Sequence, residues 1–221
     1  MNIFMPAHLL EQAEREGAKV FNKPRALRDR PEKLAILEFP QFIGPTLVTR
    51  DAQAIKRFHA AHKDIILKPL DGMGGMGIFR VRDDGLNLGG IIETLNRDGA
   101  ETVMVQKFLP AISRRRQAGS GDQAASRVAW RVFRKAARCG AILAVGGKGV
   151  AQPLSDSDRV IAEAIGPILA ARGLLLVGLD VIGNSLTEIN VTSPTCCREN
   201  ADQTGFDVAA MFVEALEAAA A

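Results

Sequence analysis

Hydrophobic and polar positions alternate most clearly over residues 174–191 of the chain. Two apolar runs, 174–182 and 186–191, are rich in leucine and β-branched residues, and Gly183, Asn184 and Ser185 separate them. Glycine, asparagine and serine tolerate the backbone conformations of tight turns, so this pattern predicts a β-hairpin. The apolar strand positions indicate a hairpin that lies in the core: Val177, Leu179, Val181, Ile189 and Val191.

The rest of the chain predicts helices interleaved with strands, which is typical of an α+β protein with antiparallel sheet rather than a regular βαβ series. Asp51 and Ser155 are suited to cap two of the helices. We expect helices over residues 7–16, 32–38, 51–62, 90–97, 155–171 and 206–220, and strands over 18–22, 46–49, 64–67, 78–81 and 103–106. In the helix 155–171, apolar residues recur at helical spacing and predict its buried face: Val160, Ile161, Ala164, Ile165 and Ile168.

Polar residues on the hairpin predict a metal site. Glu188 and Asn190 are two residues apart, so they point to the same face of their strand. A turn of two or three residues places Asp180 opposite Thr187 or Glu188 on the partner strand. Two carboxylates in apolar surroundings need a compensating cation, and such oxygen ligands suit Mg²⁺, which takes further ligands from water and nucleotide phosphates. The alternative is a surface hairpin with solvated acids; the apolar strands favour the metal.

Composition places the chain among ordinary globular proteins of one large or two small domains. It has 221 residues, 47% of them hydrophobic and 24% charged, and a net charge of +3, which is too small to indicate a nucleic-acid partner. Cys139, Cys196 and Cys197 do not form a disulfide framework and fit a reducing cytoplasm. No apolar run is long enough to span a membrane, and the N-terminus lacks the pattern of a signal peptide.

A glycine-rich loop follows Lys68. The spacing Gly72-x-Gly74-x-x-Gly77 matches a dinucleotide fingerprint, but it leads into a strand, whereas that motif opens a helix. A glycine-rich turn between two strands can instead lay its N–H groups over phosphates, with Lys68 supplying a positive charge. The alternative is a surface loop with a solvated lysine.

Several motifs together resemble bacterial glutathione synthetase, an ATP-grasp ligase. They are Asn22-Lys-Pro, Leu27-Arg-Asp, Ile66-Leu-Lys-Pro-Leu-Asp-Gly-Met-Gly-Gly, Gly178-Leu-Asp and Thr187-Glu-Ile-Asn-Val-Thr-Ser-Pro-Thr-Cys. The resemblance runs from about Leu9 to the C-terminus, except over residues 113–143. It implies an ATP-grasp fold, in which two α+β subdomains hold ATP between antiparallel sheets.

The resemblance also implies the domains and the site residues. Residues 1–22 would be the remnant of a preceding N-terminal domain, 23–110 the first ATP-grasp subdomain, 111–143 an aberrant segment and 144–221 the C-terminal subdomain. The implied ATP-binding residues are Lys23, Lys68, Asp71, Gly72, Gly74 and Gly75, with Gln106, Lys107, Phe108 and Leu109 as the adenine hinge. The implied ligands of Mg²⁺, or of Mn²⁺, are Asp180, Glu188 and Asn190, and the implied substrate-binding residues are Ser193, Pro194 and Thr195.

The implied reaction ligates γ-glutamylcysteine to glycine. ATP phosphorylates the peptide carboxylate, the resulting acyl phosphate is attacked by the glycine amine, and glutathione, ADP and phosphate result. This chemistry needs positioning and charge stabilisation but no protein nucleophile. The chain shows no Ser-His-Asp or Cys-His arrangement. The family is cytoplasmic and homo-oligomeric and carries a further N-terminal domain, most of which would precede this chain.

Residues 113–143 depart from the family's pattern and predict a frameshifted interval. Codons for 115–122 can be chosen so that a reading one base later gives Gly-Asp-Lys-Arg-Val-Leu-Val-Ile, as in the family. A shifted reading from the last base of Ala129 similarly gives Leu-Ala-Arg-Ile-Pro-Gln-Gly-Ser-Glu-Val-Arg-Gly-Asn-Leu. The cause would be a lesion in the gene or an error in its sequence. We expect a disordered or poorly packed excursion here, without ordered strand pairing over 115–122.

Three alternatives to an active glutathione synthetase stay open. The first is an inactive remnant that at most binds Mg-ATP. The second is another ATP-grasp carboxylate–amine ligase, against which residues 187–196 argue. The third is a nucleic-acid patch at Arg114, Arg115 and Arg116, which is disfavoured because the run is short and has no interleaved aromatic residues.

Overall fold

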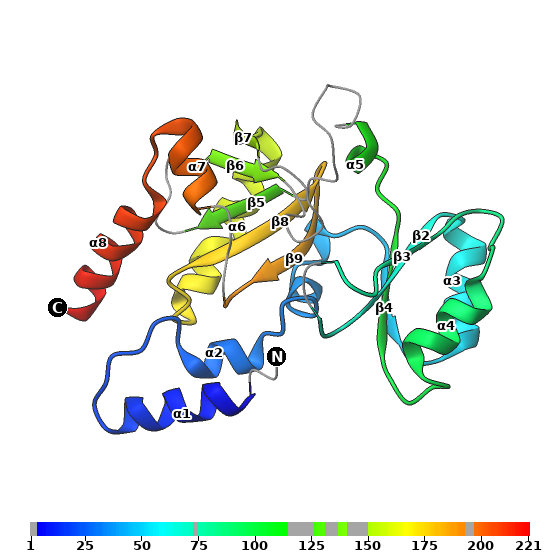
Figure 1. Ribbon diagram of the computed structural model, residues 1–221, viewed down its shortest axis with the longest axis horizontal. Coiled ribbons are helices and arrows are strands. Elements are labelled where there is room, and N and C mark those ends of the chain that lie inside the picture. Colours follow the sequence, from blue (N-terminus) through cyan, green and yellow to red (C-terminus); the bar gives the residue numbers. More distant parts are fainter. Residues whose placement is uncertain (1–3, 73–74, 115–125, 131–136, 141–149, 193–196) are drawn as a thin grey trace. The chain divides into compact units, whose positions relative to one another are not determined.

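The computed structural model describes residues 4–72, 75–114, 126–130, 137–140, 150–192 and 197–221. The chain divides into two compact units (Figure 1). The first unit joins Met1–Phe42 to Ala111–Ala221, and the second unit is Ile43–Pro110. Residues 23–42 therefore group with the C-terminal part of the chain rather than with 43–110. Among the described residues, no helix has the length and apolar character needed to cross a membrane.

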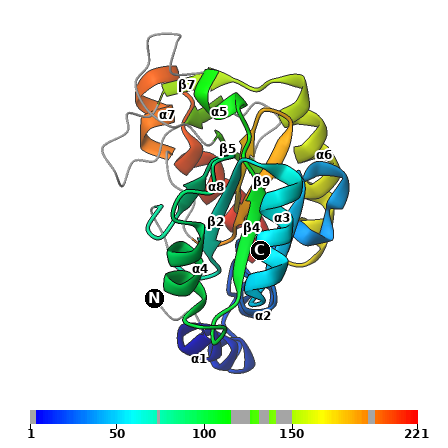
Figure 2. The same cartoon turned by 90° about the vertical axis from the view of Figure 1, so that its right-hand side faces the viewer.

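The second unit is a four-stranded antiparallel sheet with two helices on one face (Figures 1 and 2). Its strands, in the order β1-β4-β2-β3, are β1 Thr46–Thr49, β4 Val103–Lys107, β2 Ile65–Pro69 and β3 Phe79–Val81, and its helices are α3 Ala52–His62 and α4 Leu88–Asn96. The helices bury Ile55 and Ile92 against alternate residues of the sheet: Ile65, Leu67, Val81, Val103 and Val105. Alternation leaves Ile66, Lys68, Met104 and Gln106 on the other face. Asp51 caps α3 as predicted, accepting from the N–H of Gln53 at 2.8 Å.

The first unit contains a five-stranded antiparallel sheet. Its strands, in the order β7-β6-β5-β8-β9, are β7 Val150–Pro153, β6 Ala137–Gly140, β5 Ser126–Trp130, β8 Val177–Ile182 and β9 Ser185–Asn190. Helix α6, Asp156–Ala171, contacts β5, while α7, Cys197–Thr204, contacts β6 and β7 (Figure 1). The remaining elements of this unit are α1 Phe4–Arg15, α2 Pro24–Asp29, the 3₁₀ turns η1 Ala35–Glu38 and η2 Pro40–Phe42, α5 Ala111–Arg114 and α8 Val208–Ala220.

Helix α6 forms where predicted, but its buried face is partly different. Ser155 caps it, and the N–H and carboxylate of Asp158 complete a capping box with Ser155. Of the predicted face, Ile161 and Ile165 are buried, whereas Val160 and Ile168 are exposed. The helix buries Leu169 instead. The helix carries apolar residues on several of its sides, so their spacing alone did not identify the side that packs against the sheet.

Two predicted elements are wrong, for reasons that the long-range contacts explain. Residues 18–22 form no strand; Asn22 uses its side chain, rather than a backbone ladder, to join the sheet. Residues 32–38 form no α-helix, only η1. The carbonyl of Glu32 accepts a hydrogen bond from the N–H of Ile189 in β9 at 3.1 Å. This bond holds the segment along β9, where the short turn η1 forms in place of the expected helix.

Part of the interval 113–143 forms strands. β5 pairs with β8 from Ser126↔Val181 to Trp130↔Val177, and β6 pairs with β5 and β7. The expected excursion is therefore wrong for β5 and β6. Residues 115–122, for which the absence of strand pairing was predicted, lie outside the described residues.

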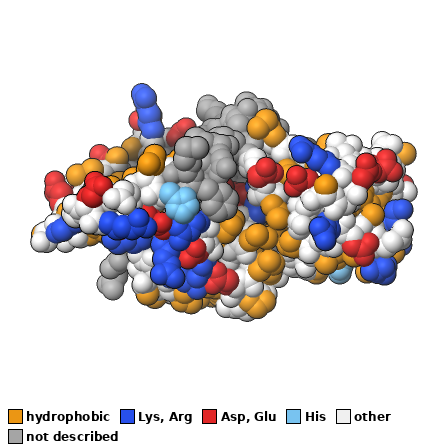
Figure 3. Space-filling view, turned by 90° about the horizontal axis from the view of Figure 1, so that it is seen from below, with side chains coloured by type: hydrophobic (Ala, Val, Ile, Leu, Met, Phe, Trp, Pro, Cys, Tyr) orange, Lys and Arg blue, Asp and Glu red, His pale blue; other side chains and the backbone are white. Residues whose placement is uncertain are grey.

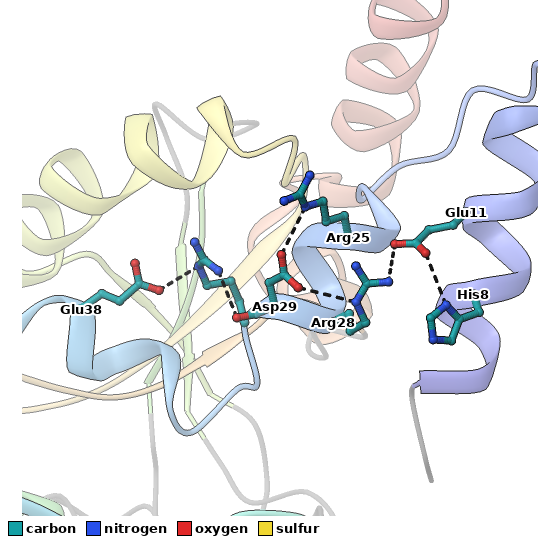
Figure 4. A network of polar contacts seen from close by, with 7 residues as sticks. His8, Glu11, Arg25, Arg28, Asp29 and Glu38 are labelled. Atoms are coloured by element: carbon teal, nitrogen blue, oxygen red, sulfur yellow. Dashed lines mark hydrogen bonds and ion pairs between the residues drawn. The ribbon is translucent and has the colours of Figure 1, made fainter.

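Ion pairs join α1 to α2. Arg28 contacts Glu11 with 2.5 Å between Nη1 and Oε1, and His8 lies 3.4 Å from the same carboxylate (Figure 4). Seen from below, basic side chains with acids between them cover this part of the molecule (Figure 3). Arg28 and Glu11 are partly buried, whereas His8 is exposed. Ion pairs that solvent still reaches each contribute little to stability. We interpret them as ties that orient α1 and α2.

Asn22 anchors the chain before α2 to the start of β8 and the end of β9. Its Nδ2 donates to the carbonyls of Leu176 and Val191 at 2.7 and 2.8 Å, and its Oδ1 accepts from the N–H groups of Leu175 and Leu176 at 2.5 and 2.9 Å. All four hydrogen-bonding positions of this amide, two protons and two lone pairs, are thus engaged with backbone. The side chain of Asn22 therefore supplies backbone groups of residues 175, 176 and 191 with hydrogen bonds that a neighbouring strand would otherwise make.

Replacing Asn22 by alanine is expected to lower the free energy of unfolding by about 3 kcal/mol, because four backbone groups lose their partner in a half-buried site. Urea denaturation followed by circular dichroism measures this change. The matched control is Asn184→Ala in the exposed hairpin turn, with an expected cost of about 0.5 kcal/mol. Equal costs at the two positions would show that Asn22 is not an anchor.

Candidate functional site

The hairpin β8–β9 brings Asp180 and Glu188 together. Ile182 pairs with Ser185 across a two-residue turn, in which Gly183 has a φ of +60° that favours glycine. Regular pairing from this turn would place Thr187 opposite Asp180. A bulge between Asp180 and Val181 shifts the register, so that Glu188 lies opposite Asp180 instead. Of the two predicted registers, the structure has the one that puts both carboxylates on one face.

Asn190 completes this group on the same face. Its partner in the ladder is Gly178, two residues from Asp180. Its Nδ2 donates to Oδ1 of Asp180 at 3.1 Å. Asp180 and Asn190 are 4% and 7% exposed. The hydroxyl of Thr187, the bulged residue, donates to the carbonyl of Asp180 at 3.0 Å and so stabilises the irregular register.

Lys33 is a site residue that sequence reasoning missed. Its ammonium lies 3.5 Å from the carboxylate of Glu188, and the residue is only 6% exposed. The hydrogen bond between Glu32 and Ile189 lays this segment along β9, which delivers Lys33 to the carboxylates. A buried ammonium is costly unless it is paired, and the carboxylate of Glu188 provides that pairing. In return, the ammonium offsets part of the negative charge of the hairpin carboxylates. In the sequence, only the closeness of Lys33 to the Leu27-Arg-Asp motif could have drawn attention to it. That closeness does not indicate that Lys33 pairs with Glu188.

Lys23, by contrast, contacts Glu14 and Gly173 rather than the hairpin carboxylates. Its Nζ is 2.5 Å from Oε1 of Glu14 in α1, and its side chain is 44% exposed. Its N–H donates to the carbonyl of Gly173 at 3.0 Å. A Cβ at Gly173, whose φ is +80°, would collide with the stem of Lys23. The structure therefore gives Lys23 a place in packing α1 against the segment that precedes β8.

The hairpin residues fit a divalent cation. Two carboxylates and one amide oxygen on one sheet face are hard oxygen donors, and the ammonium of Lys33 lies beside Glu188. Where the structure describes the chain, no group of three or more His, Cys, Asp or Glu side chains gathers as a metal site. The fit thus rests on Asp180, Glu188 and the amide of Asn190 together.

The second unit carries the remaining predicted ATP residues that the structure describes. Lys68 lies in β2, 7% exposed, and points to the sheet face away from α3 and α4. Asp71 is exposed in the turn that follows. Gly77 has a φ of +71°, and a Cβ there would lie 3.2 Å from Cγ of Pro69, so the return of the loop requires glycine. Gly72 and Gly75 flank Gly74, which lies outside the described residues.

The segment from Gln106 to Leu109 is held by hydrogen bonds at three successive residues. Nε2 of Gln106 donates to the hydroxyl of Thr46 at 3.1 Å. The N–H of Lys107 donates to the carbonyl of Pro45 at 3.0 Å, and the N–H of Phe108 donates to the carbonyl of Asp64 at 2.8 Å. These two N–H groups are engaged within the protein, so base recognition by a backbone N–H would fall to Leu109.

Three predicted substrate-binding residues lie outside the described residues: Ser193, Pro194 and Thr195. Their neighbours are placed. Val191 is buried at the end of β9, and Cys197 begins α7. The predicted role of the three residues stays a prediction.

Comparison with known families decides the assignment. The ATP-grasp domain of prokaryotic glutathione synthetase matches residues 32–205. The chain belongs to the prokaryotic glutathione synthetase family. The matched range begins one residue before Lys33 and includes Lys68, the glycine loop, the 106–109 segment and the hairpin.

Curated glutathione synthetases are similar over nearly the whole chain. The glutathione synthetase of Ralstonia nicotianae is 57% identical over 219 residues, which cover 96% of this chain and 66% of that protein. The glutathione synthetase of Bordetella parapertussis is 51% identical over 227 residues, covering 100% of this chain and 70% of that protein. The chain thus spans about two thirds of the length of these glutathione synthetases.

Solved structures show the same fold at low sequence identity. The ATP-grasp ligase PsnB, complexed with Mg, ADP and a phosphomimetic variant of its minimal precursor, has a TM-score of 0.66 and 20% identity, over 98% of this chain and 68% of PsnB. The D-cycloserine synthetase DcsG has a TM-score of 0.67 and 17% identity, over 96% of this chain and 78% of DcsG. The chain has the ATP-grasp fold, as the resemblance of its motifs to glutathione synthetase predicted.

Proposed function

We propose that the protein is a glutathione synthase, which ligates γ-glutamylcysteine to glycine with hydrolysis of ATP to ADP and phosphate. Membership of the prokaryotic glutathione synthetase family supports the substrates. The observation that carries the proposal is the hairpin group of the buried Asp180 and Asn190 and the partly buried Glu188, with the buried Lys33 beside it. Such a group of acids and a cation on one sheet face suits a nucleotide with its metal.

Asp180, Glu188 and Asn190 would hold Mg²⁺, or Mn²⁺, through their side-chain oxygens. When bound, the ion neutralises phosphate oxygens and polarises the phosphorus for attack. The bulge at Thr187 keeps the two carboxylates opposite each other, so the ligands are oriented before the ion arrives. Asp180 and Asn190 are buried away from bulk water. Charges have a larger effect on a transferring phosphoryl group in such a low-dielectric site than in water.

Lys33 and Lys68 would bind the phosphates of ATP. Both are buried. Lys68 lies in β2, where it pairs with Met104, and Lys33 follows Glu32, whose carbonyl accepts from Ile189 in β9. The predicted phosphate role of Lys23 stays a prediction; we favour Lys33, because Lys23 is paired with Glu14 in α1. An ammonium next to a metal-binding carboxylate is placed to meet phosphate oxygens that bind the same ion.

The glycine loop and the 106–109 segment would bind the rest of the nucleotide. The loop after Lys68 contains Asp71, Gly72, Gly74 and Gly75. The backbone N–H groups of this loop would cover the phosphates. Gln106, Lys107, Phe108 and Leu109 would form the edge that recognises adenine, with Leu109 the residue whose N–H faces the base.

The chemistry proceeds in two steps. A carboxylate oxygen of γ-glutamylcysteine attacks the γ-phosphorus of ATP, the bond from that phosphorus to the bridging oxygen breaks, and ADP leaves. The glycine amine then attacks the acyl carbon, loses its proton to water or phosphate, and expels phosphate. The residues of the chain hold and neutralise charge rather than form a covalent bond. Ser193, Pro194 and Thr195 would border the site of the peptide and glycine.

An inactive remnant is the second candidate, and the interval 113–143 favours it. Its residues depart from the family's pattern where substrate contacts are expected, while the hairpin, Lys33 and Lys68 are retained. Such a chain would bind Mg-ATP without ligation. Use of another amine or carboxylate would instead indicate a different ATP-grasp ligase. We further propose a homo-oligomeric protein of the reducing cytoplasm, as in the family.

Release of ADP by the purified chain tests the proposal. With Mg-ATP present, release is expected to require both γ-glutamylcysteine and glycine, and glutathione should form in equal amount. Binding of Mg-ATP without any ligation would support the remnant. Release with other amine or carboxylate substrates, but not with this pair, would support a different ligase.

A further inference from the structure

Arg80, Asp64 and Phe108 form a compact cluster at one end of the sheet in the second unit. Arg80 donates from Nε to Oδ1 of Asp64 at 2.9 Å and from Nη2 to Oδ2 at 2.6 Å. Its guanidinium carbon lies 3.4 Å from the centroid of the Phe108 ring. The same cation thus makes a two-pronged ion pair and a stacking contact. Asp64 directly precedes β2, Arg80 lies in the edge strand β3, and Phe108 directly follows β4.

The backbone ties the same residues together. The N–H of Phe108 donates to the carbonyl of Asp64 at 2.8 Å. Ile66 pairs with Arg80 on one side and with Gln106 on the other, so these two residues share the sheet face that α3 and α4 leave uncovered. Lys68 lies on that face as well. The cluster therefore borders the face that carries the proposed phosphate lysine.

Only arginine satisfies both contacts at once. Its planar fork matches the two oxygens of a carboxylate, while its flat face stacks on an aromatic ring. The hydrogen bond to Asp64 raises the pKa of Arg80 above its ordinary value; burial lowers it, and the charge of Asp64 adds to the rise. The side chain is therefore a cation at every working pH. Lysine would keep the charge but lose the fork and the planar stack.

We propose that Arg80 is a positioning residue for nucleotide-base recognition, which fixes Phe108 and with it the 106–109 segment. This inference rests on the proposed function, in which that segment binds adenine. With the Phe108 ring clamped and its N–H bonded to Asp64, the backbone at Leu109 is held ready for the base. A segment that is ordered in advance loses less conformational entropy when the nucleotide binds.

Three variants test the role: Arg80→Gln, Arg80→Lys and, as matched control, Arg82→Gln. Arg82 is the same residue type, two positions further along, with an exposed side chain. Displacement of a fluorescent ATP analogue measures affinity, with Mg²⁺ present and with ATP or inorganic tripolyphosphate as competitor. Both Arg80 variants are expected to lower the affinity for ATP by about tenfold and the affinity for tripolyphosphate by less than about twofold. The control should bind both competitors as the unchanged chain does. Equal losses for both competitors would overturn the proposal, because they would indicate a general effect on the fold.

Amide hydrogen exchange of the ligand-free chain provides a second, independent readout. Arg80→Gln and Arg80→Lys should speed exchange at the N–H groups of Lys107 and Phe108, while those of β2 stay protected. Unchanged exchange at Phe108 would overturn the positioning role. If the unchanged chain fails to bind ATP, the proposed function fails, yet the exchange result still decides whether Arg80 holds this segment. In an active chain, the same variants should raise the KM for ATP and leave kcat within about twofold.

Discussion

Replacing Lys33 by methionine is expected to lower kcat/KM for ATP by about 100-fold, whereas the same change at Lys23 should alter it by about twofold at most. Methionine keeps most of the unbranched stem but removes the charge. Lys33 lies 3.5 Å from Glu188 and is buried, while Lys23 is exposed and pairs with Glu14. Steady-state ADP release in the presence of γ-glutamylcysteine and glycine measures the two effects.

Stability controls separate catalysis from folding in this pair. Lys33→Met leaves Glu188 without its ion pair, so Tm should fall; the double change Lys33→Met and Glu188→Gln should restore much of Tm without restoring activity. A Lys23 variant with the larger loss of kcat/KM would return the phosphate role to Lys23. Recovery of activity in the double variant would contradict a direct role for Lys33.

The hairpin carboxylates are expected to have the largest effect on kcat. Asp180→Asn and Glu188→Gln should each lower kcat by about 1,000-fold, because each removes one charged ligand from the proposed metal group without changing its shape. The concentration of Mg²⁺ needed for half-maximal activity should rise in both. Thermal unfolding without Mg²⁺ should keep or raise Tm in Asp180→Asn, since one of two facing negative charges is removed.

Ser185→Ala, in the same hairpin, is the matched control for these two variants. Ser185 pairs with Ile182 beside the turn rather than with Asp180, so kcat should stay within about twofold. Loss of less than about tenfold in kcat for both carboxylate variants would rule out the proposed ligand set. Loss of secondary structure in either variant would show that the pair serves folding instead.

The hairpin was predictable because its determinants are local. Alternating apolar residues and a glycine-led turn specify two paired strands, and the side-chain period then puts Glu188 and Asn190 on one face. The partner of Asp180 stayed open between Thr187 and Glu188, because a bulge is a tertiary adjustment that the turn length does not reveal. Helix α3, with its capping Asp51, was specified by local signals in the same way.

Long-range contacts explain what the sequence did not predict. Lys33 was missed because its role depends on the hydrogen bond between Glu32 and Ile189, which are 157 residues apart by their numbers (189 − 32). The same bond ties to β9 the segment in which a helix was expected and η1 forms. Asn22 was placed in an expected strand, yet its amide bonds to Leu176 and Val191 show that a single side chain replaces the ladder.

Oxygen transfer from the peptide to phosphate tests the proposed acyl-phosphate ligation most directly. γ-Glutamylcysteine labelled with ¹⁸O in the carboxylate of its cysteine would be incubated with the chain, Mg-ATP and glycine, and the released phosphate analysed by mass spectrometry. We predict one ¹⁸O atom in each phosphate, because the carboxylate oxygen that attacks the γ-phosphorus leaves with it. Phosphate without the label, released by water attack on ATP, would contradict the ligase mechanism.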